Sequence, residues 1–104
     1  SANVLDARAA ERLTGLSKSF AVRPELIDLL ADDVVPTAGL IWCSGRLEDV
    51  LYHGSSSRCH VRLDAETVFA VARPESGTAF HVPPRGSSVR IAWRPESMVL
   101  LESG

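Results

Sequence analysis

The sequence has little of several features that mark particular classes of protein. Only two of its 104 residues are cysteines, too few for a secreted scaffold held together by disulfides. Reduced thiols in a cytosolic protein are therefore expected, with one disulfide between Cys43 and Cys59 as the alternative. No apolar run approaches the roughly 20 residues that span a bilayer, and no signal peptide opens the chain.

The chain also lacks the excess of basic charge that nucleic-acid-binding domains carry. Its formal net charge is −2, and only 6% of its residues are aromatic. A module for single-stranded nucleic acid needs a positive groove and aromatic platforms on which bases stack, so the composition argues against this class. With 45% hydrophobic and 23% charged residues, the chain has the composition of one soluble globular domain.

Motifs for nucleotide hydrolysis are missing as well. No Gly-x-x-x-x-Gly-Lys-Ser/Thr loop occurs, and the nearest segment, 15–19, lacks the upstream glycine. Such a loop is needed because its backbone amides and lysine hold the phosphates of ATP. No Leu-Ser-Gly-Gly-Gln-like signature occurs either. The chain is therefore not expected to hydrolyse ATP by itself, nor to hold a cofactor.

Two other kinds of site, a zinc site and a serine nucleophile, are not favoured by the spacing of the residues. Cys43, His53, Cys59 and His60 are zinc-ligand types, but adjacent residues of a strand point to opposite faces and no Cys-x-x-Cys pair exists. A buried Cys59 and a solvated His60 are expected instead. The serines at 55–57 are interpreted as a turn rather than as a nucleophile site.

A repeated nine-residue pattern is the most informative feature present. Residues 22–30 and 93–101 each have a bulky apolar residue, then Arg-Pro-Glu, then an aliphatic run ending in Leu-Leu. Proline has no N–H and a fixed φ, so it ends strand pairing and forces a corner, after which a new strand begins. Two related halves with matching corners are predicted. A third Arg-Pro-Glu, Arg73-Pro74-Glu75, has no aliphatic run behind it and is expected to end a strand in a loop.

The charged residues of the two corners are the candidate site. Arg23, Glu25, Arg94 and Glu96 are proposed as contacts between the halves or with another subunit. The alternative is a local ion pair within each corner, worth about 0–1 kcal/mol when exposed.

Local patterns predict one helix and several short strands. Asp6 is the expected N-cap of a helix of about two turns, and Gly15 fits the position after its last turn. Strands are expected at 2–5, 18–22, 26–30, 40–43, 45–53, 58–63, 67–72, 88–94 and 98–101, with a turn-rich connection over 32–39. Keeping Leu47, Val50 and Tyr52 on one face requires a β-bulge near 48–49.

Alternation along two of these strands predicts the core. The residues expected inward are Cys59, Val61, Leu63, Val89, Ile91 and Trp93, and those expected outward are Arg58, His60, Arg62, Arg90 and Arg94. The outward arginines are interpreted as a solvated face, or alternatively as an anion or partner contact. Both tryptophans, Trp42 and Trp93, are expected in the core, with an exposed partner patch as the alternative.

These patterns together predict the fold class. The expected fold is mainly β: a small OB-like Greek-key β-barrel with one short helix. It forms a single domain, with an abbreviated first half over 1–37 and a second half over 38–104. Ser1 and Gly104 look like arbitrary cut points, so a fragment of a longer protein is expected.

Three segments carry a resemblance to a known family. Residues 45–54 read Gly-x-Leu-x-x-Val-x-Tyr-x-Gly, residues 60–63 read His-Val-Arg-Leu, and residues 86–96 read Gly-Ser-Ser-Val-Arg-Ile-Ala-Trp-Arg-Pro-Glu. In this order and spacing they resemble the TOBE domain, the transport-associated OB-like domain C-terminal to the nucleotide-binding domain of ABC-importer ATPase subunits. The segment 2–5 resembles the exit from the ATPase domain in spermidine/putrescine-type members.

The resemblance implies a regulatory and dimerisation domain of an ABC importer, in which polyamines are the favoured solute. The implied partners are the nucleotide-binding domain of the same chain, which would bind ATP and Mg²⁺, a second ATPase subunit, and indirectly the membrane permease. The implied location is the cytoplasmic face of the cell membrane. Alternative functions are a stand-alone small-ligand (oxyanion) binder and a single-stranded nucleic-acid-binding OB module.

The missing phosphate loop leads to a direct prediction. The 104-residue chain should show no ATPase activity and no tight ATP binding, because nothing in it cradles the phosphates. Isothermal calorimetry with Mg-ATP measures this, and a micromolar dissociation constant would contradict it.

Overall fold

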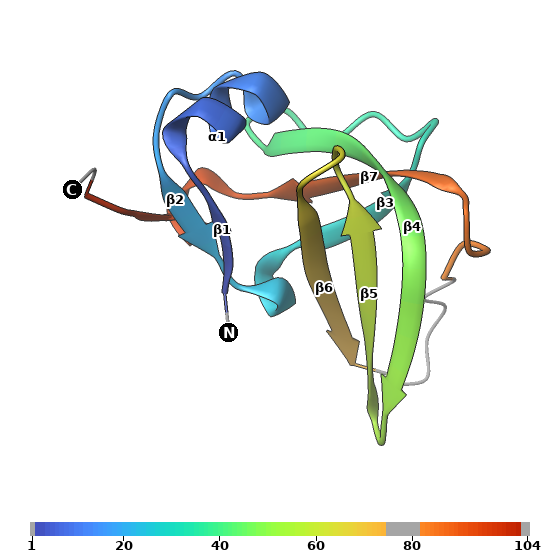
Figure 1. Cartoon of the computed structure of the whole chain (residues 1–104). Helices are drawn as coiled ribbons and strands as arrows, with labels where there is room; N and C mark the ends of the chain where they lie inside the picture. The colour runs from blue at the N-terminus through green and yellow to red at the C-terminus, as the bar shows by residue number, and fades with distance from the viewer. Residues whose placement is uncertain (1, 75–81, 103–104) are drawn as a thin grey trace.

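The longest element of the computed structural model, which describes residues 2–74 and 82–102, is the central strand β4 (Figure 1). The elements in chain order are β1 (Asn3–Leu5), α1 (Ala7–Thr14), β2 (Phe20–Val22), the 3₁₀ turn η1 (Pro24–Leu26), β3 (Asp28–Ala31), β4 (Ile41–His53), β5 (Ser56–Arg62), β6 (Val68–Pro74), β7 (Ser88–Trp93), the 3₁₀ turn η2 (Pro95–Ser97) and β8 (Val99–Leu100). The expectation of a mainly β chain with one short helix is confirmed.

The strands form two antiparallel sheets rather than one closed barrel. The larger sheet has the order β3-β7-β4-β5-β6, and the smaller has the order β1-β2-β8. Among the described residues no ladder joins the two sheets, and the edge strands β3 and β6 do not pair with each other. The expected OB-like Greek-key arrangement of strands is therefore present as two sheets, and the barrel is not closed among the described residues.

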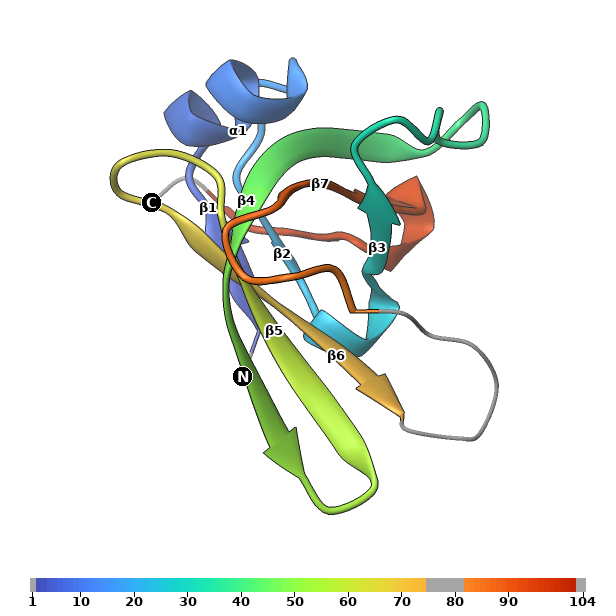
Figure 2. The same ribbon diagram turned by 90° about the vertical axis from the view of Figure 1, so that its right-hand side faces the viewer.

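Strand β4 has two partners, and this makes it curl. Residues 41–46 pair with β7, and residues 46–53 pair with β5 (Figure 2). Gly45 lies where the partners change: a Cβ there would meet Cγ1 of Val61 at 2.5 Å and the carbonyl oxygen of Arg62 at 2.8 Å. The register shifts between Leu47 and Asp49, so the predicted bulge is confirmed.

The core lies between the two sheets and is centred on Trp93. The Trp93 ring lies 5.9 Å, centroid to centroid, from both Phe20 of the smaller sheet and Phe69 of the larger one. All three side chains are buried. Burying an aromatic or aliphatic side chain of this size contributes about 1.5–3 kcal/mol, so these rings hold the sheets together.

The predicted alternation of β5 and β7 is confirmed. The fully buried members are Cys59, Val61, Val89, Ile91 and Trp93, while Leu63 is half-buried. Arg90 faces away from this core, as expected from its parity. Val50 packs on the same core across the bulge, whereas Tyr52, further along the same face, is 66% exposed on the projecting hairpin.

The two Arg-Pro-Glu corners have matching backbone geometry, and the strand after each corner pairs with the strand before the other corner. Arg23 has φ −76° and ψ 143°, and Arg94 has φ −77° and ψ 143°; each is followed by a proline that opens a 3₁₀ turn. Strand β3, after the first corner, pairs with β7, which precedes the second. Strand β8, after the second corner, pairs with β2, which precedes the first. The division into halves at residue 37 stays a prediction.

The strand expected over 26–30 begins later than predicted. Residues Pro24–Leu26 form a 3₁₀ turn, and β3 spans Asp28–Ala31. Proline favours the first position of a helical turn, where its missing N–H costs nothing. The third Arg-Pro-Glu extends β6 as far as Pro74, and its Glu75 lies outside the described residues.

The helix has the predicted caps. The Asp6 carboxylate accepts a hydrogen bond of 2.8 Å from the Ala9 backbone N–H, and Gly15 adopts a left-handed φ of 83°. The helix begins and ends where the sequence indicated.

One side chain ties the smaller sheet to the edge of the larger one. The Asn3 amide nitrogen on β1 donates to the Ala70 carbonyl at 2.9 Å, and its oxygen accepts from the Ala70 N–H at 2.7 Å. Ala70 lies on the edge strand β6, so the asparagine amide replaces the peptide group of a missing neighbouring strand.

This contact gives a stability prediction. Asn3→Ala should lower the free energy of unfolding by about 1–3 kcal/mol, because it leaves a half-buried N–H and carbonyl of Ala70 without partners. Urea unfolding measures the change. Val4→Ala in the same strand, at a side chain that is 59% exposed, is the control and should stay within about 0.5 kcal/mol of the parent. Equal effects of the two substitutions would contradict the role of Asn3.

Candidate functional site

The structure does not bring the four predicted corner residues together. The side chains of Arg23, Glu25, Arg94 and Glu96 are all exposed. Within residues 2–74 and 82–102 they form no ion pair, so the local pairs considered from the sequence are not made. Their role as contacts between the halves or with another subunit stays a prediction.

The two corners differ in what covers them. At the first corner Pro24 and Ile27 are buried, and η1 packs against β6. At the second corner the equivalent residues are Pro95, which is exposed, and Met98, which is half-buried. The two corners therefore have the same backbone geometry, but the first is covered by β6 and the second has an exposed proline.

The open corner forms an apolar hollow of about 320 Å³. We call it the second-corner surface, and its residues are Leu16, Lys18, Ile41, Pro95, Met98 and Leu100. Beside it β8 is an edge strand on which Val99 and Leu100 are 62% and 59% exposed. An apolar hollow next to an unpaired strand edge has the character of a protein contact surface.

Trp42 lies on the surface, which corrects the expectation that both tryptophans are buried. Its side chain is 41% exposed, and the Arg90 guanidinium stacks over its ring, 4.8 Å from the centroid. Arg90 also donates to the Val34 carbonyl at 2.7 Å. Counting alternate positions back from the buried Leu47 places Cys43 inside and Trp42 outside, so register could have identified this residue.

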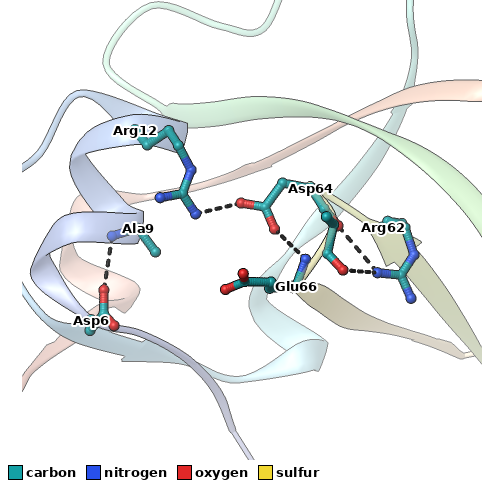
Figure 3. Close-up of polar contacts among 7 residues, drawn as sticks. Asp6, Ala9, Arg12, Arg62, Asp64 and Glu66 are labelled. Carbon is teal, nitrogen blue, oxygen red and sulfur yellow. Dashed lines mark hydrogen bonds and ion pairs between the residues drawn. The ribbon is translucent and has the colours of Figure 1, made fainter.

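A polar network joins the helix to the turn between β5 and β6 (Figure 3). Arg12 on α1 donates to the Asp64 carboxylate at 2.5 Å, and the Glu66 backbone N–H donates to the other oxygen at 2.9 Å. Arg62 donates to the carbonyls of Asp64 and Ala65. The hydrogen bond from Arg12, followed by that from the Glu66 N–H, lowers the pKa of Asp64 to about 2. This network fixes the helix on the sheet.

The cysteines are positioned as core residues. Cys43 and Cys59 are both buried free thiols, and burial raises the pKa of Cys43 to about 12. Burial also raises the pKa of Cys59, against a lowering influence of Arg73. Neither thiol is prepared to act as a nucleophile, because the thiolate is the reactive form.

The serine-rich turn is shorter than predicted. Gly54, with φ 59°, and Ser55 form the hairpin tip, while Ser56 and the buried Ser57 already belong to β5. The Ser56 hydroxyl donates to the His53 carbonyl at 3.2 Å, a turn contact. Across the part of the chain that the structure describes, no group of three metal-ligand side chains comes together, and no helix is long and apolar enough to cross a membrane.

Comparison with known proteins identifies relatives of the chain. Residues 20–101 match the family profile of the TOBE domain. The chain is 30% identical over 95 residues, 91% of its length, to the spermidine/putrescine import ATP-binding protein PotA of Thermobifida fusca. It is 31% identical over 102 residues, 95% of its length, to the uncharacterized ABC transporter ATP-binding protein YdcT of Escherichia coli K12. It spans 24% and 28% of these two proteins, about a quarter of their length.

A solved structure shares the fold. The cytoplasmic molybdate-binding protein ModG, in a form with molybdate bound, superimposes with a TM-score of 0.66 over 89% of this chain and 69% of its own. The two sequences are 13% identical, so this likeness concerns the fold alone.

The Asp64 network gives a pH prediction. Because the folded-state pKa of Asp64 is lowered from 3.8 to about 2, its contribution to stability is present above about pH 4 and is lost as the pH falls through 2. Asp64→Asn should therefore lower the melting temperature at pH 7, and the difference from the parent should shrink towards pH 2. Asp33→Asn, in the exposed connection, is the control. A difference that stays constant down to pH 2 would contradict this assignment.

Proposed function

The chain belongs to the TOBE domain family, and from this we propose that it is the C-terminal regulatory and dimerisation domain of an ABC importer's ATP-binding subunit. The observation that carries the proposal is the match of more than nine-tenths of the chain to each of two transporter ATP-binding proteins. One of these is named for spermidine and putrescine import, which supports polyamines as the transported solute.

In this proposal the chain has no catalytic step of its own. ATP and Mg²⁺ would be held by the nucleotide-binding domain of the parent protein, since this sequence contains no phosphate loop. The domain would work through contacts: with that nucleotide-binding domain, with a second ATP-binding subunit, and through them with the permease at the cytoplasmic face of the membrane.

The second-corner surface supports a contact role. By analogy with the first corner, where η1 is covered by β6, the second corner has an apolar hollow and no covering strand among the described residues. The exposed edge of β8 beside it offers unpaired backbone groups as well as apolar side chains. We assign this surface to the contact with the second ATP-binding subunit.

The oxyanion-binding alternative has weaker support. Among the comparisons it is supported only by the shared fold of ModG, and at 13% identity a shared fold carries no ligand. No observation on the second-corner surface favours an oxyanion, because its lining is mostly apolar with Lys18 as its one charged residue.

The gene offers the most direct test. The coding sequence upstream of Ser1 should encode a phosphate loop and a Leu-Ser-Gly-Gly-Gln-like signature, as expected for an ATP-binding subunit. An upstream sequence without either motif would contradict the proposed function.

A substitution tests the assigned surface. In the full-length subunit, Leu100→Asp should weaken dimerisation by about tenfold or more, since it places a charge in the apolar contact. Sedimentation equilibrium measures the change. Val35→Asp, at a side chain that is 83% exposed in the connection between β3 and β4, is the matched control and should leave dimerisation unchanged. Equal dimerisation of the parent and Leu100→Asp would rule out this surface as the interface.

A further inference from the structure

Arg58 differs from the other half-buried arginines of the described chain, which are Arg62, Arg73 and Arg90. Each of those has a partner: Arg62 binds Glu48, Arg73 binds Asp28 at 3.0 Å, and Arg90 donates to the Val34 carbonyl. Within residues 2–74 and 82–102, Arg58 makes no ion pair and no side-chain hydrogen bond. No nitrogen of Arg58 is among the buried side-chain atoms without a partner in the described chain, so its N–H groups remain open to water and to an added acceptor.

Arg58 lines a hollow of about 500 Å³ formed by residues of β4, β5 and β6. The hairpin of β4 and β5 to which it belongs projects from the rest of the molecule (Figure 1). The register places Leu51 of β4 on one side of Arg58 and Ala72 of β6 on the other. His60, two residues along β5, faces the same way, and His53 lies opposite Ser56 nearer the hairpin tip. The small side chain of Ala72 leaves the space above β6 open.

The polar groups that line this hollow are mostly donors. The guanidinium of Arg58 presents several N–H groups in a planar fork, and each imidazole of His53 and His60 offers at least one more. Among the described residues, no carboxylate lines the hollow. Asp49 lies opposite His60 on the same face, and its carboxylate already accepts from the Val50 N–H at 3.0 Å. The hollow therefore suits an anion.

The size and lining of the hollow limit the class of anion that would fit it. A volume of about 500 Å³ is larger than a bare tetrahedral ion requires, and the Leu51 and Ala72 side chains give it an apolar wall. Arginine pairs with phosphate through two parallel hydrogen bonds, which adds both energy and geometric selection.

We propose that this hollow binds a small organic phosphate, with Arg58 holding the phosphoryl group between His53 and His60. The organic part then lies against Leu51 and Ala72. This site is separate from the second-corner surface and does not depend on the proposed transporter function, so the failure of one leaves the other standing.

A titration followed by nuclear magnetic resonance tests the site on the 104-residue chain. Glycerol 3-phosphate should shift the amide signals of residues 51–60 and of Ala72, and the shifts should saturate with a millimolar dissociation constant. Inorganic phosphate should bind more weakly at the same residues, and glycerol should not bind, at fixed ionic strength. Shifts spread over all the arginines, or a linear response without saturation, would overturn the proposal.

Substitutions test whether binding depends on Arg58 itself or only on the positive charge of the domain. Arg58→Gln should weaken glycerol 3-phosphate binding by about tenfold or more, the usual effect of losing a charge-assisted hydrogen bond. Arg58→Lys, which keeps the charge and loses the fork, should weaken it several-fold. Arg8→Gln, at an exposed arginine of α1 outside the hollow, should leave binding unchanged.

A carboxylate probe defines the ligand class. Glycerate, which carries a carboxylate in place of the phosphoryl group, should bind at least several-fold more weakly than glycerol 3-phosphate. Equal binding of the two probes, or equal losses in Arg58→Gln and Arg8→Gln, would overturn the assignment. Dispersed amide spectra confirm that each variant is folded.

Discussion

The structure depends on one strand that must serve two partners. Strand β4 holds β7 with its first half and β5 with its second, so the larger sheet exists only if this strand bends between them. Gly45 permits the bend, because any side chain there would collide with Val61 and with the backbone of Arg62. The bulge after Leu47 then returns Val50 to the core face despite the extra residue. Because β4 continues past the core to His53, the same strand also builds the projecting hairpin and the hollow beside it.

Local sequence patterns predicted those parts of the fold that depend on neighbouring residues. Alternation placed Val61, Ile91 and Trp93 inside, the mismatch between Leu47 and Val50 located the bulge, and Asp6 and Gly15 marked the ends of the helix. The same reasoning was wrong for Trp42, where hydrophobicity was given more weight than register. Ties such as Asn3 with Ala70 and Arg12 with Asp64 join residues 67 and 52 positions apart, and no local pattern indicates them. Closure of the barrel was also beyond prediction, since it depends on whether distant edges meet.

The sequence predicted where the two corners lie but not what surrounds each of them. The repeat located two corners of equal geometry, and φ and ψ at Arg23 and Arg94 agree within a degree. What a corner contacts is decided by tertiary structure: β6 covers η1, while Pro95 and Met98 remain accessible. The charged residues that drew attention in the sequence are exposed at both corners, whereas the apolar residues distinguish them. An interface centred on the second corner therefore owes more to Met98 and Leu100 than to Arg94 and Glu96, because exposed charges contribute little and desolvated apolar groups contribute most.

The two edge strands of the larger sheet, β3 and β6, are connected to their surroundings by side-chain contacts. In a closed barrel, backbone hydrogen bonds between strands would make these connections. Asn3 covers β6 at Ala70, and Arg73 on β6 reaches Asp28 on β3 at 3.0 Å, so the two edges are linked without a ladder. Such links are weaker than a strand pairing, but they leave the outer face of β4, β5 and β6 uncovered. Arg58 lines the hollow on these strands, and none of the residues around that hollow belongs to the second-corner surface. In Figure 1 the tip of the β4–β5 hairpin points away from the C-terminal strand. Because the barrel is open, two different surfaces are accessible. The second-corner surface is apolar and suits a protein partner, whereas the hollow around Arg58 is rich in hydrogen-bond donors and suits a small anion.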